Sequence, residues 1–578
     1  MSLTAAMLAS QSALHAAQAG IQVAANNIAN AATPGYSRQV AHLSPIRGVS
    51  IGNGGTIGRG VIVQDVRRQV NEALLARSWG SMSEHAAAEQ RFQAMSAVES
   101  ALNELSGYDL SSELASFFGA WSERANLSES SAVVVQRGVQ LADSVRRLRS
   151  DLGATRAQID AQIGGEVAQA SSLLDRIAEI NRTIADAEQG VRTANDLRDQ
   201  RDLLVGQLAE MIDVNIVEQP DGRYDVLLGS APVVLGGTSR GLEMRQVTID
   251  GVTRVEVTIR ASGQEVAPSG GRIGGLLAAR GDGIGRTIDA LDTIATQLVF
   301  AVNDAHATGT NAAGLTETFA ELRLAPGDRS LALNDPANSA LAALPFAPRT
   351  GGFLVNVRHV ATGLVQTVRV EVDLDGITAS GAGGFAGDTS AQAIADALNA
   401  VGNLAAGFTP DGRLRVAAST GYDFSFSDDT SGVLATLGVN AFFTGRDASD
   451  VGVRADLAAN PSRLMTGAMV DGRFVENATA LRIAGLQDTA IEGLGGRTLR
   501  AAWSDAVQTV AVSTQAAQRR AEAARVVRDS LDAQRASVSG VSLDEEAMNL
   551  LNFQKQYQGA ARVIALADEL LDSLMSIL

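Results

Sequence analysis

The sequence predicts a multidomain chain of mixed fold class, with discontinuous helical domains built from both termini and inserted β-rich or α+β outer domains. Three observations predict this class. The chain has 578 residues, more than the ~250–300 at which a single hydrophobic core stops growing. Both ends are Ala-rich with one apolar face, whereas the middle alternates like β-strands. The order helical, β-rich, helical indicates that the first and last thirds pack together, with a coiled-coil-like pairing of the two ends.

The N-terminal segment is predicted to be a helix that ends near Ala32. Its apolar residues recur at steps of three and four, the spacing of one helix face, with Ser10 as a polar exception. Thr33 precedes Pro34, which disfavours helix at Thr33, and Gly35 follows. The apolar face consists of Leu3, Met7, Leu14, Ala17, Ile21, Ala24 and Ile28.

The C-terminal segment is predicted to be a second helix, which begins after Ser542. Ser542 can cap the helix, and Asp544, Glu545 and Glu546 fill the first turn, where the helix dipole favours anions. No polar residue closes the apolar face along this segment, so this end is expected either to pack on a partner or to be loosely ordered. The face consists of Leu543, Ala547, Leu550, Phe553, Tyr557, Ala560, Ile564, Ala567, Leu571, Leu574 and Leu578.

The region between the ends changes character several times. Residues 85–212 are predicted to be helical, and residues 214–260 alternate like strands around an Asp221-Gly222 turn. A helix follows at 284–307, and a Gly- and Thr-rich region with an Asp411-Gly412 turn and a short helix near 391–401 precedes a last helical stretch at 475–535. The predicted domains are residues 1–40 with 541–578 (terminal helical domain), 41–213 with 272–319 and 446–540 (second, mainly helical domain), 214–271 (small β segment) and 320–445 (inserted β-rich outer domain).

Composition excludes several functions. The net charge of −17 argues against nucleic-acid binding, which needs clustered Lys and Arg. The absence of cysteine excludes disulfides, thiol catalysis and thiolate metal sites, and the five histidines are scattered. Because no signal peptide and no unbroken apolar span of ~20 residues is found, we expect no membrane insertion, and either a cytosolic chain or one exported without a cleavable signal peptide.

Three motifs are better explained by structure than by catalysis or metal binding. Residues 48–52 match the G-x-S-x-G nucleophile elbow, but further glycines follow where a helix is needed. Asp373 and Asp375 resemble part of a calcium loop but lack its spacing and closing Glu, which favours a solvated turn. The charged run 195–202 places Arg198 and Asp202 one turn apart, as on a helix face with ion pairs. We therefore expect no catalytic residues, no cofactor and no metal.

Three asparagines, Asn26, Asn27 and Asn30, stand near the end of the first predicted helix. Asn is a poor helix former, and the rest of this helix is rich in Ala. They form either an ordinary polar face near a helix end or a set of hydrogen bonds between neighbouring subunits. The residue pattern alone leaves both interpretations open.

Residues 26–39, NNIANAATPGYSRQ, closely resemble the N-terminal signature of the flagellar rod, hook and hook-associated proteins. The ending Ser37-Arg38-Gln39 resembles the branch of hook-associated proteins that forms the hook–filament junction. Three further segments resemble the same branch: residues 55–61 with Arg67 and Arg68, the charged run 195–204, and residues 542–557 with 567–569. The stretch after His306 departs from the family pattern, and residues 320–445 match nothing in it, which agrees with a variable outer domain.

The resemblance implies a non-enzymatic structural subunit of the bacterial flagellum that self-assembles at the hook–filament junction through its terminal helices. It implies a homo-oligomeric ring, contacts with the flagellar hook protein and the third hook-associated protein, and a cytoplasmic export chaperone at the C-terminal helix. It also implies an extracellular location reached through type III export. The alternatives are a flagellar hook or distal rod subunit or, in a different class, an outer domain that acts as an adhesin or glycan-active module.

The resemblance and the apolar faces together predict the residues of the subunit–subunit interface. These are Leu3, Met7, Leu14, Ile21, Asn26, Asn27, Ile28, Asn30, Leu550, Phe553, Tyr557, Ile564, Leu571, Leu574 and Leu578.

Overall fold

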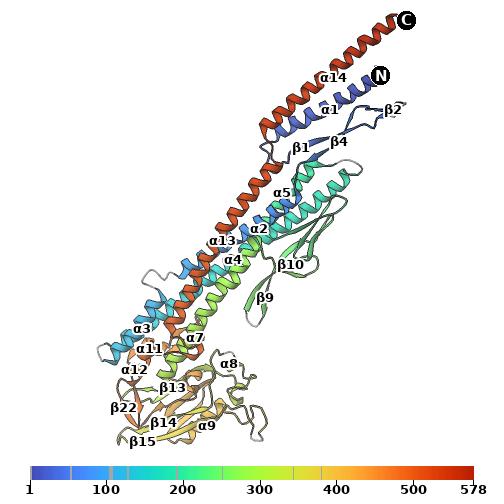
Figure 1. The fold of residues 1–578 in the computed structure, drawn as a ribbon. Helices are drawn as coiled ribbons and strands as arrows, with labels where there is room; N and C mark the ends of the chain where they lie inside the picture. The colour runs from blue at the N-terminus through green and yellow to red at the C-terminus, as the bar shows by residue number, and fades with distance from the viewer. Residues whose placement is uncertain are drawn as a thin grey trace. The chain divides into compact units, whose positions relative to one another are not determined.

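The computed structural model describes residues 3–51, 55–102, 109–126, 129–189, 193–249, 252–342, 344–378 and 381–577. The chain folds as two compact units, each built from several stretches of sequence (Figure 1). Unit 1 consists of residues 1–95, 158–280 and 514–578, and unit 2 of residues 96–157 and 281–513. Both units are therefore discontinuous, and unit 1 contains both ends of the chain.

Unit 1 combines helices from the two ends with small antiparallel sheets. Its helices, three of which continue into unit 2, are α1 (Leu3–Ala29), α2 (Glu72–Leu102), α4 (Ser131–Ala187), α5 (Asn195–Met211), α6 (Gly271–Ala278), α13 (Leu499–Ser539) and α14 (Leu543–Ile577). Its strands are β1 (Gln39–Pro45), β2 (Val49–Ile51), β3 (Gly55–Ile57), β4 (Val61–Arg68), β5 (Asn215–Glu218), β6 (Tyr224–Leu228), β7 (Ala231–Leu235), β8 (Thr238–Ser239), β9 (Leu242–Ile249), β10 (Val252–Ile259) and β11 (Glu265–Val266).

The helical body of unit 1 joins distant parts of the chain. The Ser78 hydroxyl on α2 donates to Asp532 on α13, and α13 buries a row of small and apolar residues that includes Ala517, Ala524 and Leu531. Helix α6 packs closely on α2, because a Cβ at Gly275 would lie 2.3 Å from the carbonyl oxygen of Ala87. The first and last thirds of the chain pack together, as the order of elements predicts.

The sheets of unit 1 are small and locally connected. Strands β1 and β4 form a two-stranded ribbon, β5 to β8 a four-stranded meander, and β9 to β11 a three-stranded sheet. Gly222, with φ of +78°, lies in the turn between β5 and β6, where the Asp221-Gly222 pair predicts a hairpin. Because a two-stranded ribbon is only marginally stable in water, the β1–β4 ribbon depends on α1, which packs against both strands.

Unit 2 contains an aromatic helical core and a β-rich part. Its own helices are α3 (Leu110–Ala125), α7 (Arg286–Ala307), α8 (Ser339–Ala342), α9 (Ala391–Ala400), α10 (Val433–Leu437), α11 (Ala455–Ala459) and α12 (Ala478–Gly485), with a π-helix at Ala279–Gly285 leading into α7. Its strands are β12 (Gly309–Thr310), β13 (Glu317–Arg323), β14 (Gly351–His359), β15 (Val365–Val372), β16 (Leu404–Phe408), β17 (Arg413–Ala418), β18 (Tyr422–Ser427), β19 (Phe443–Thr444), β20 (Gly452–Val453), β21 (Gly467–Val470) and β22 (Arg473–Val475).

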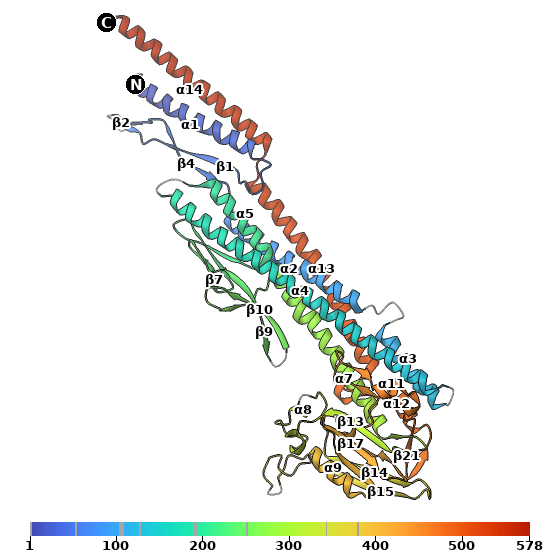
Figure 2. The ribbon, with the colours of Figure 1, turned by 180° about the vertical axis from the view of Figure 1, so that it is seen from behind.

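Two three-stranded sheets, β15-β14-β18 and β13-β17-β16, share one apolar core with α9 and α10. Phe353, Phe424 and Phe426 are buried in this core, and Gly412, with φ of +89°, lies in the β16–β17 turn that Asp411-Gly412 predicts. Figure 2 shows α9 beside these strands.

A polar network holds α7 to the residues that follow the β-rich part. Asn303 accepts the backbone N–H groups of Phe442 and Phe443 and donates to the Phe443 carbonyl. Asn440 donates to the carbonyl of His306, and the His306 ring contacts the carbonyl of Asn440 at 2.7 Å. These bonds close the unit between segments more than a hundred residues apart in sequence.

The structure corrects several predicted boundaries. Helix α1 ends at Ala29, three residues before the predicted end, because the backbone N–H groups of Ala31 and Thr33 bond to carbonyls three residues back in a turn. Helix α2 already begins at Glu72, and the helical stretch that begins at 271 precedes the predicted 284–307. None of the helices in the described residues combines the length and the apolar composition needed to cross a membrane.

Candidate assembly interface

The two ends of the chain form an antiparallel helix pair. We call the contact between these two helices the seam. Along the seam, Asn27 near the end of α1 meets Glu546 at the start of α14, and Gly20 meets Phe553. Residue numbers thus rise along α1 while they fall along α14, and Figures 1 and 2 show both termini at the same end of the pair. This pairing confirms the predicted association of the terminal helices.

Small residues make the seam narrow on the α1 side. The buried residues of α1 are Ser10, Ala16, Ala17, Gly20, Ala24 and Asn27. The ring of Phe553 fills the notch at Gly20, since a Cβ there would lie 2.6 Å from ring carbons. Helix α1 therefore approaches α14 closely because its buried face carries almost no side-chain volume.

Replacing Gly20 by Val should weaken the terminal pair. Overpacking a filled seam costs about 1–3 kcal/mol, which exceeds the helix propensity gained by removing a glycine. We expect faster hydrogen exchange in α1 and α14, and partial recovery when Phe553→Ala is added. Gly559→Val is the matched control, because a Cβ at Gly559 meets no atom within 4 Å. Equal exchange rates in Gly20→Val and Gly559→Val would contradict the close packing of Phe553 on Gly20.

The predicted interface residues fall into four groups. Asn27 is buried, and three residues are exposed: Asn26, Tyr557 and Leu571. The half-buried residues are Leu3, Met7, Leu14, Ile21, Ile28, Asn30, Leu550, Phe553 and Ile564. Leu578 and the side chain of Leu574 lie outside the described residues. Of this set, Asn27 and Phe553 take part in the contacts between α1 and α14 described above.

Asn27 is fully hydrogen-bonded inside the chain. It is 1% exposed, and its amide nitrogen donates to the Gln39 carbonyl at 2.9 Å and to Glu546 Oε2 at 3.1 Å. Its amide oxygen accepts the Gln39 N–H and the Tyr36 hydroxyl, both within 2.9 Å. All four hydrogen-bonding positions of the amide are thus used. Asn27 fastens the loop after α1 to the start of α14.

Arg38 forms the second fastening of that loop. Its Nε donates to Glu546 Oε1 at 2.8 Å, its Nη1 lies 3.1 Å from Glu545, and its backbone N–H donates to the Ser539 carbonyl at 2.9 Å. Glu546 is only 2% exposed. Because both carboxylate oxygens of Glu546 are hydrogen-bonded, its buried charge is compensated by Arg38 and Asn27.

Acidic residues on α5 hold the same loop and β4 to the body of unit 1. Asp199 accepts the backbone N–H of Ser37 and, with Asp202, the guanidinium of Arg68 at 2.9 and 2.7 Å. Burial raises the pKa of Asp199 against the effect of Arg68, and burial together with the charges of Asp199, Asp196 and Glu546 raises the pKa of Tyr36 to about 12. The second half of the loop, residues 36–39, thus lies beside acidic side chains whose charge Arg38 and Arg68 compensate.

The charged run lies on helix α5 and forms ion pairs, but Arg198 and Asp202 pair with residues outside the run and not with each other. Arg198 pairs with Glu188 and Glu218, whereas Asp202 pairs with Arg68. Sequence reasoning missed these partners because each lies outside the helix that carries the run. The one local signal in the sequence was the density of carboxylates at 196, 199 and 202, which does not identify their partners.

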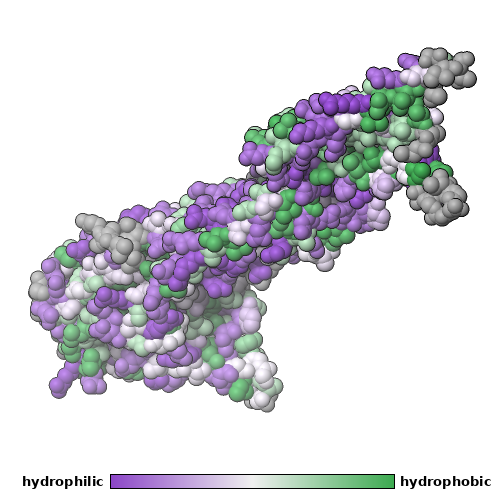
Figure 3. All heavy atoms as spheres, turned by 45° about the horizontal axis from the view of Figure 1, so that its top comes forward, coloured by the Kyte–Doolittle hydropathy of each residue, from purple (hydrophilic) through white to green (hydrophobic). Residues whose placement is uncertain are grey.

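Helix α14 also exposes apolar side chains on a side that α1 does not cover. We call Met548, Val563, Leu566 and Leu570 the outer row; each is between 45% and 58% exposed. The row is continued between Met548 and Val563 by Asn552, Lys555 and Gly559 at steps of three and four, so it follows one side of the helix. In Figure 3 hydrophobic atoms gather where the chain termini lie. Sequence analysis missed the outer row because it followed a single stripe.

Two other motifs have a clear structural setting. Ser50 lies in β2, which pairs with β3 in a hairpin, and Gly52 lies outside the described residues. A nucleophile elbow requires a strand-to-helix turn.

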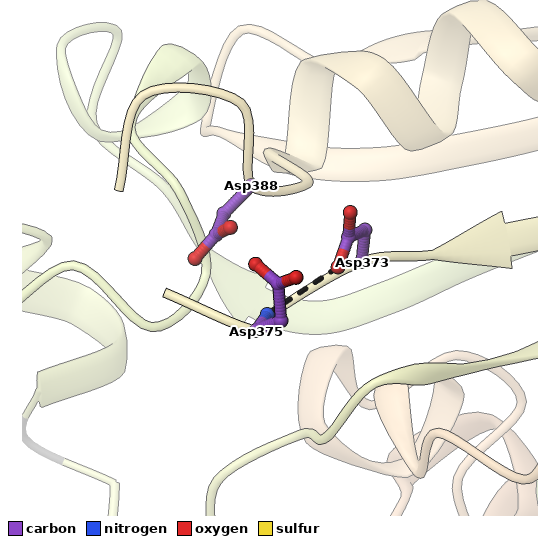
Figure 4. A group of neighbouring side chains, drawn as sticks. All are labelled: Asp373, Asp375 and Asp388. Carbon is purple, nitrogen blue, oxygen red and sulfur yellow. Dashed lines mark hydrogen bonds between the residues drawn. The ribbon is translucent and has the colours of Figure 1, made fainter. Parts of the chain in front are cut away.

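Asp373 and Asp375 are exposed, and the structure adds Asp388, with ligand atoms of the three carboxylates within 4.8 Å of one another (Figure 4). Asp388 accepts Asn334 and the Gly376 N–H through Oδ2, so the group is part of a hydrogen-bonded loop.

Family models match three segments of the chain. Residues 95–319 match the helical domain of flagellar hook-associated protein FlgK, residues 7–36 the flagella basal body rod protein model, and residues 533–577 the C-terminal model of flagellar basal body rod FlgEFG proteins. The two terminal matches include most of α1 and of α14. The matched segments together span just over half of the sequence.

Full-length relatives carry one name. The chain is 27% identical to flagellar hook-associated protein 1 of Salmonella typhimurium and 24% identical to that of Escherichia coli, with 98% of each chain covered. It is 25% identical to that of Bacillus subtilis, covering 98% of this chain and 96% of the relative. The solved hook junction protein FlgK from Burkholderia pseudomallei aligns with a TM-score of 0.48 and 14% identity over 80% of this chain and all of that one. Over almost its whole length the chain is therefore similar to flagellar hook-associated protein 1, and its central helical segment matches the helical-domain model of the same protein.

Proposed function

We propose that this protein is a structural subunit of the bacterial flagellum that assembles at the hook–filament junction through its terminal helices. One observation carries the proposal: α14 packs one apolar face on α1, while the four apolar side chains of the outer row, on its other side, are exposed in the single chain. A helix with a second apolar face requires a second partner to bury it. A further copy of the chain in a homo-oligomeric ring supplies that partner.

The proposal extends to the partners and the location implied by the family. The ring would contact the flagellar hook protein and the third hook-associated protein, and an export chaperone would cover α14 before assembly. The chain would reach the cell exterior through the flagellar type III route and act without enzymatic chemistry. The division into a terminal domain (1–40 with 541–578), a second helical domain, a β segment (214–271) and an outer domain (320–445) belongs to the same proposal.

The outer row offers a direct test. Leu566→Glu with Leu570→Glu should leave the chain folded, because both side chains are already exposed, but should prevent burial of the row between subunits. We expect motility and retention on the flagellum to fall strongly in a strain that carries this variant as its only copy. Gln554→Glu with Gln558→Glu adds the same charge at exposed positions on another side of α14 and serves as the control. Full motility of the Leu566/Leu570 variant would refute the proposal.

A hook or distal rod subunit is the second candidate, favoured by the rod-protein models that match both ends of the chain. Labelled electron micrographs distinguish the two candidates. A hook subunit would be labelled along the whole hook, a rod subunit at the base, and a junction subunit in one band at the tip of the hook.

A further inference from the structure

We propose that Asn27, Arg38 and Glu546 form a register pin, which selects a single alignment of α1 against α14. The inference rests on the proposed function, since it concerns the helix pair through which the subunit assembles. It assigns to these three residues the specificity of the pairing, beyond their contribution to its stability.

The seam itself specifies register weakly. Apart from Asn27, the buried residues of α1 are Ala, Gly and Ser, so sliding α14 by four or seven residues brings small side chains against its apolar face again. A slide of seven residues in one direction would place Phe553 opposite Asn27 instead of Gly20. The other three slides would place it opposite Ala24, Ala16 or Ala13. Those positions are less open than a glycine but still small. Uniform seams of this kind permit alternative alignments unless a polar group distinguishes one of them.

The pin supplies that distinction. In the observed register Glu546 is 2% exposed and is bonded by Asn27 and Arg38. A slide toward the start of α1 would bring the Glu546 carboxylate opposite Val23 or Gly20, and a slide the other way would carry it past Ala29. In either direction the buried Asn27 amide would lose Glu546 as a partner. A buried charge without a partner strongly disfavours the slipped state.

The pin also ties the register to the body of unit 1. Arg38 is held by the Ser539 carbonyl at the end of α13, and the adjacent Ser37 N–H by Asp199 on α5. Asn27 and Gly20 are seven residues apart on α1, as are Glu546 and Phe553 on α14. The register pin and the Gly20–Phe553 contact are therefore compatible with the same alignment of α1 against α14. The pin also fixes this alignment relative to the body of unit 1.

Spin-label distance measurements on the purified full-length protein test this inference. The chain has no cysteine, so labels at Gln11→Cys and Gln558→Cys, both exposed, report one distance across the pair. The wild-type background should give a single narrow distance. The background Asn27→Leu/Arg38→Met/Glu546→Leu, which keeps the volume but removes the polar groups, should add a population shifted by about 5–10 Å, one or two helical turns.

Two further backgrounds complete the design. Arg38→Met alone, which alters only the loop, should broaden the distribution even if the triple variant folds poorly. Asp544→Asn removes an exposed charge from the same first turn of α14 and should leave the distance unchanged. A single unchanged distance in both pin variants, or a broad distribution in the wild-type background, would overturn the register pin. These distances do not depend on a flagellum, so loss of motility in the outer-row variant with unchanged distances here would refute the pin and leave the proposed function intact.

Discussion

A chain truncated after Gly540, which lacks α14, should fold in its body and in unit 2 but should fail to assemble. The core residues of α13 remain, and so does the aromatic core of unit 2 around Phe117, Trp121 and Phe442. Helix α1 loses the partner that covers one of its faces, and most of the stability of a helix in a protein comes from such packing. The outer row, which we propose as the surface for subunit contacts, disappears together with α14.

Motility and fractionation measure this outcome. A strain with the truncated chain as its only copy should swim no better than a strain without the protein, and exported protein should be found in the medium instead of on the flagellum. Circular dichroism of the purified truncated chain should show a cooperative thermal transition. The full chain with Gln554→Glu and Gln558→Glu controls for substitution near this end. Normal motility of the truncated strain would contradict assembly through the terminal helices.

The terminal helices were predictable because their signals are local. Periodic apolar residues, the Ser542 position before α14 and the Thr33-Pro34 stop each depend on neighbours within a few residues. The β-hairpins at Gly222 and Gly412 were predictable for the same reason, since a positive φ favours glycine. The predicted end of α1, Ala32, lies three residues beyond the observed end, Ala29, because residues 30–33 form a turn before Pro34.

The polar contacts of the candidate interface could not be predicted, because they join residues far apart in sequence. Asn27 and Glu546 are 519 positions apart, and Arg68 and Asp199 are 131 apart. Periodicity identifies faces of helices but not which charged residues meet. The resemblance placed the Ser37-Arg38-Gln39 ending in the family without explaining it. In the structure this ending is the segment that binds α14, α13 and α5 at once.

The imidazole of His306 makes unit 2 sensitive to acid. It is fully buried at the end of α7, where its Nε2 accepts the Met465 N–H and its Nδ1 therefore donates to the Asn440 carbonyl. Burial, together with the charge of Arg454, lowers the pKa of His306 to about 3, partly opposed by the Asn440 hydrogen bond and Asp456. The neutral ring uses both of its nitrogens in hydrogen bonds. A proton added at Nε2 would face the Met465 N–H and find no acceptor there.

Below the ordinary histidine pKa near 6.5, His306 binds a proton in the unfolded chain but stays neutral in the folded chain. The contribution of neutral His306 to the free energy of unfolding is therefore fully present above pH ~6.5. It falls by about 1.4 kcal/mol per pH unit down to pH ~3, which is a loss of about 3 kcal/mol at pH 4. Urea unfolding of His306→Asn at pH 7 and pH 4 should show a smaller pH effect than the wild type by that amount. Trp121→Phe, which loosens packing against the same ring without removing a titrating group, should keep the wild-type pH effect. If His306→Asn and the wild type lose equal stability between these pH values, the acid sensitivity arises elsewhere in the chain.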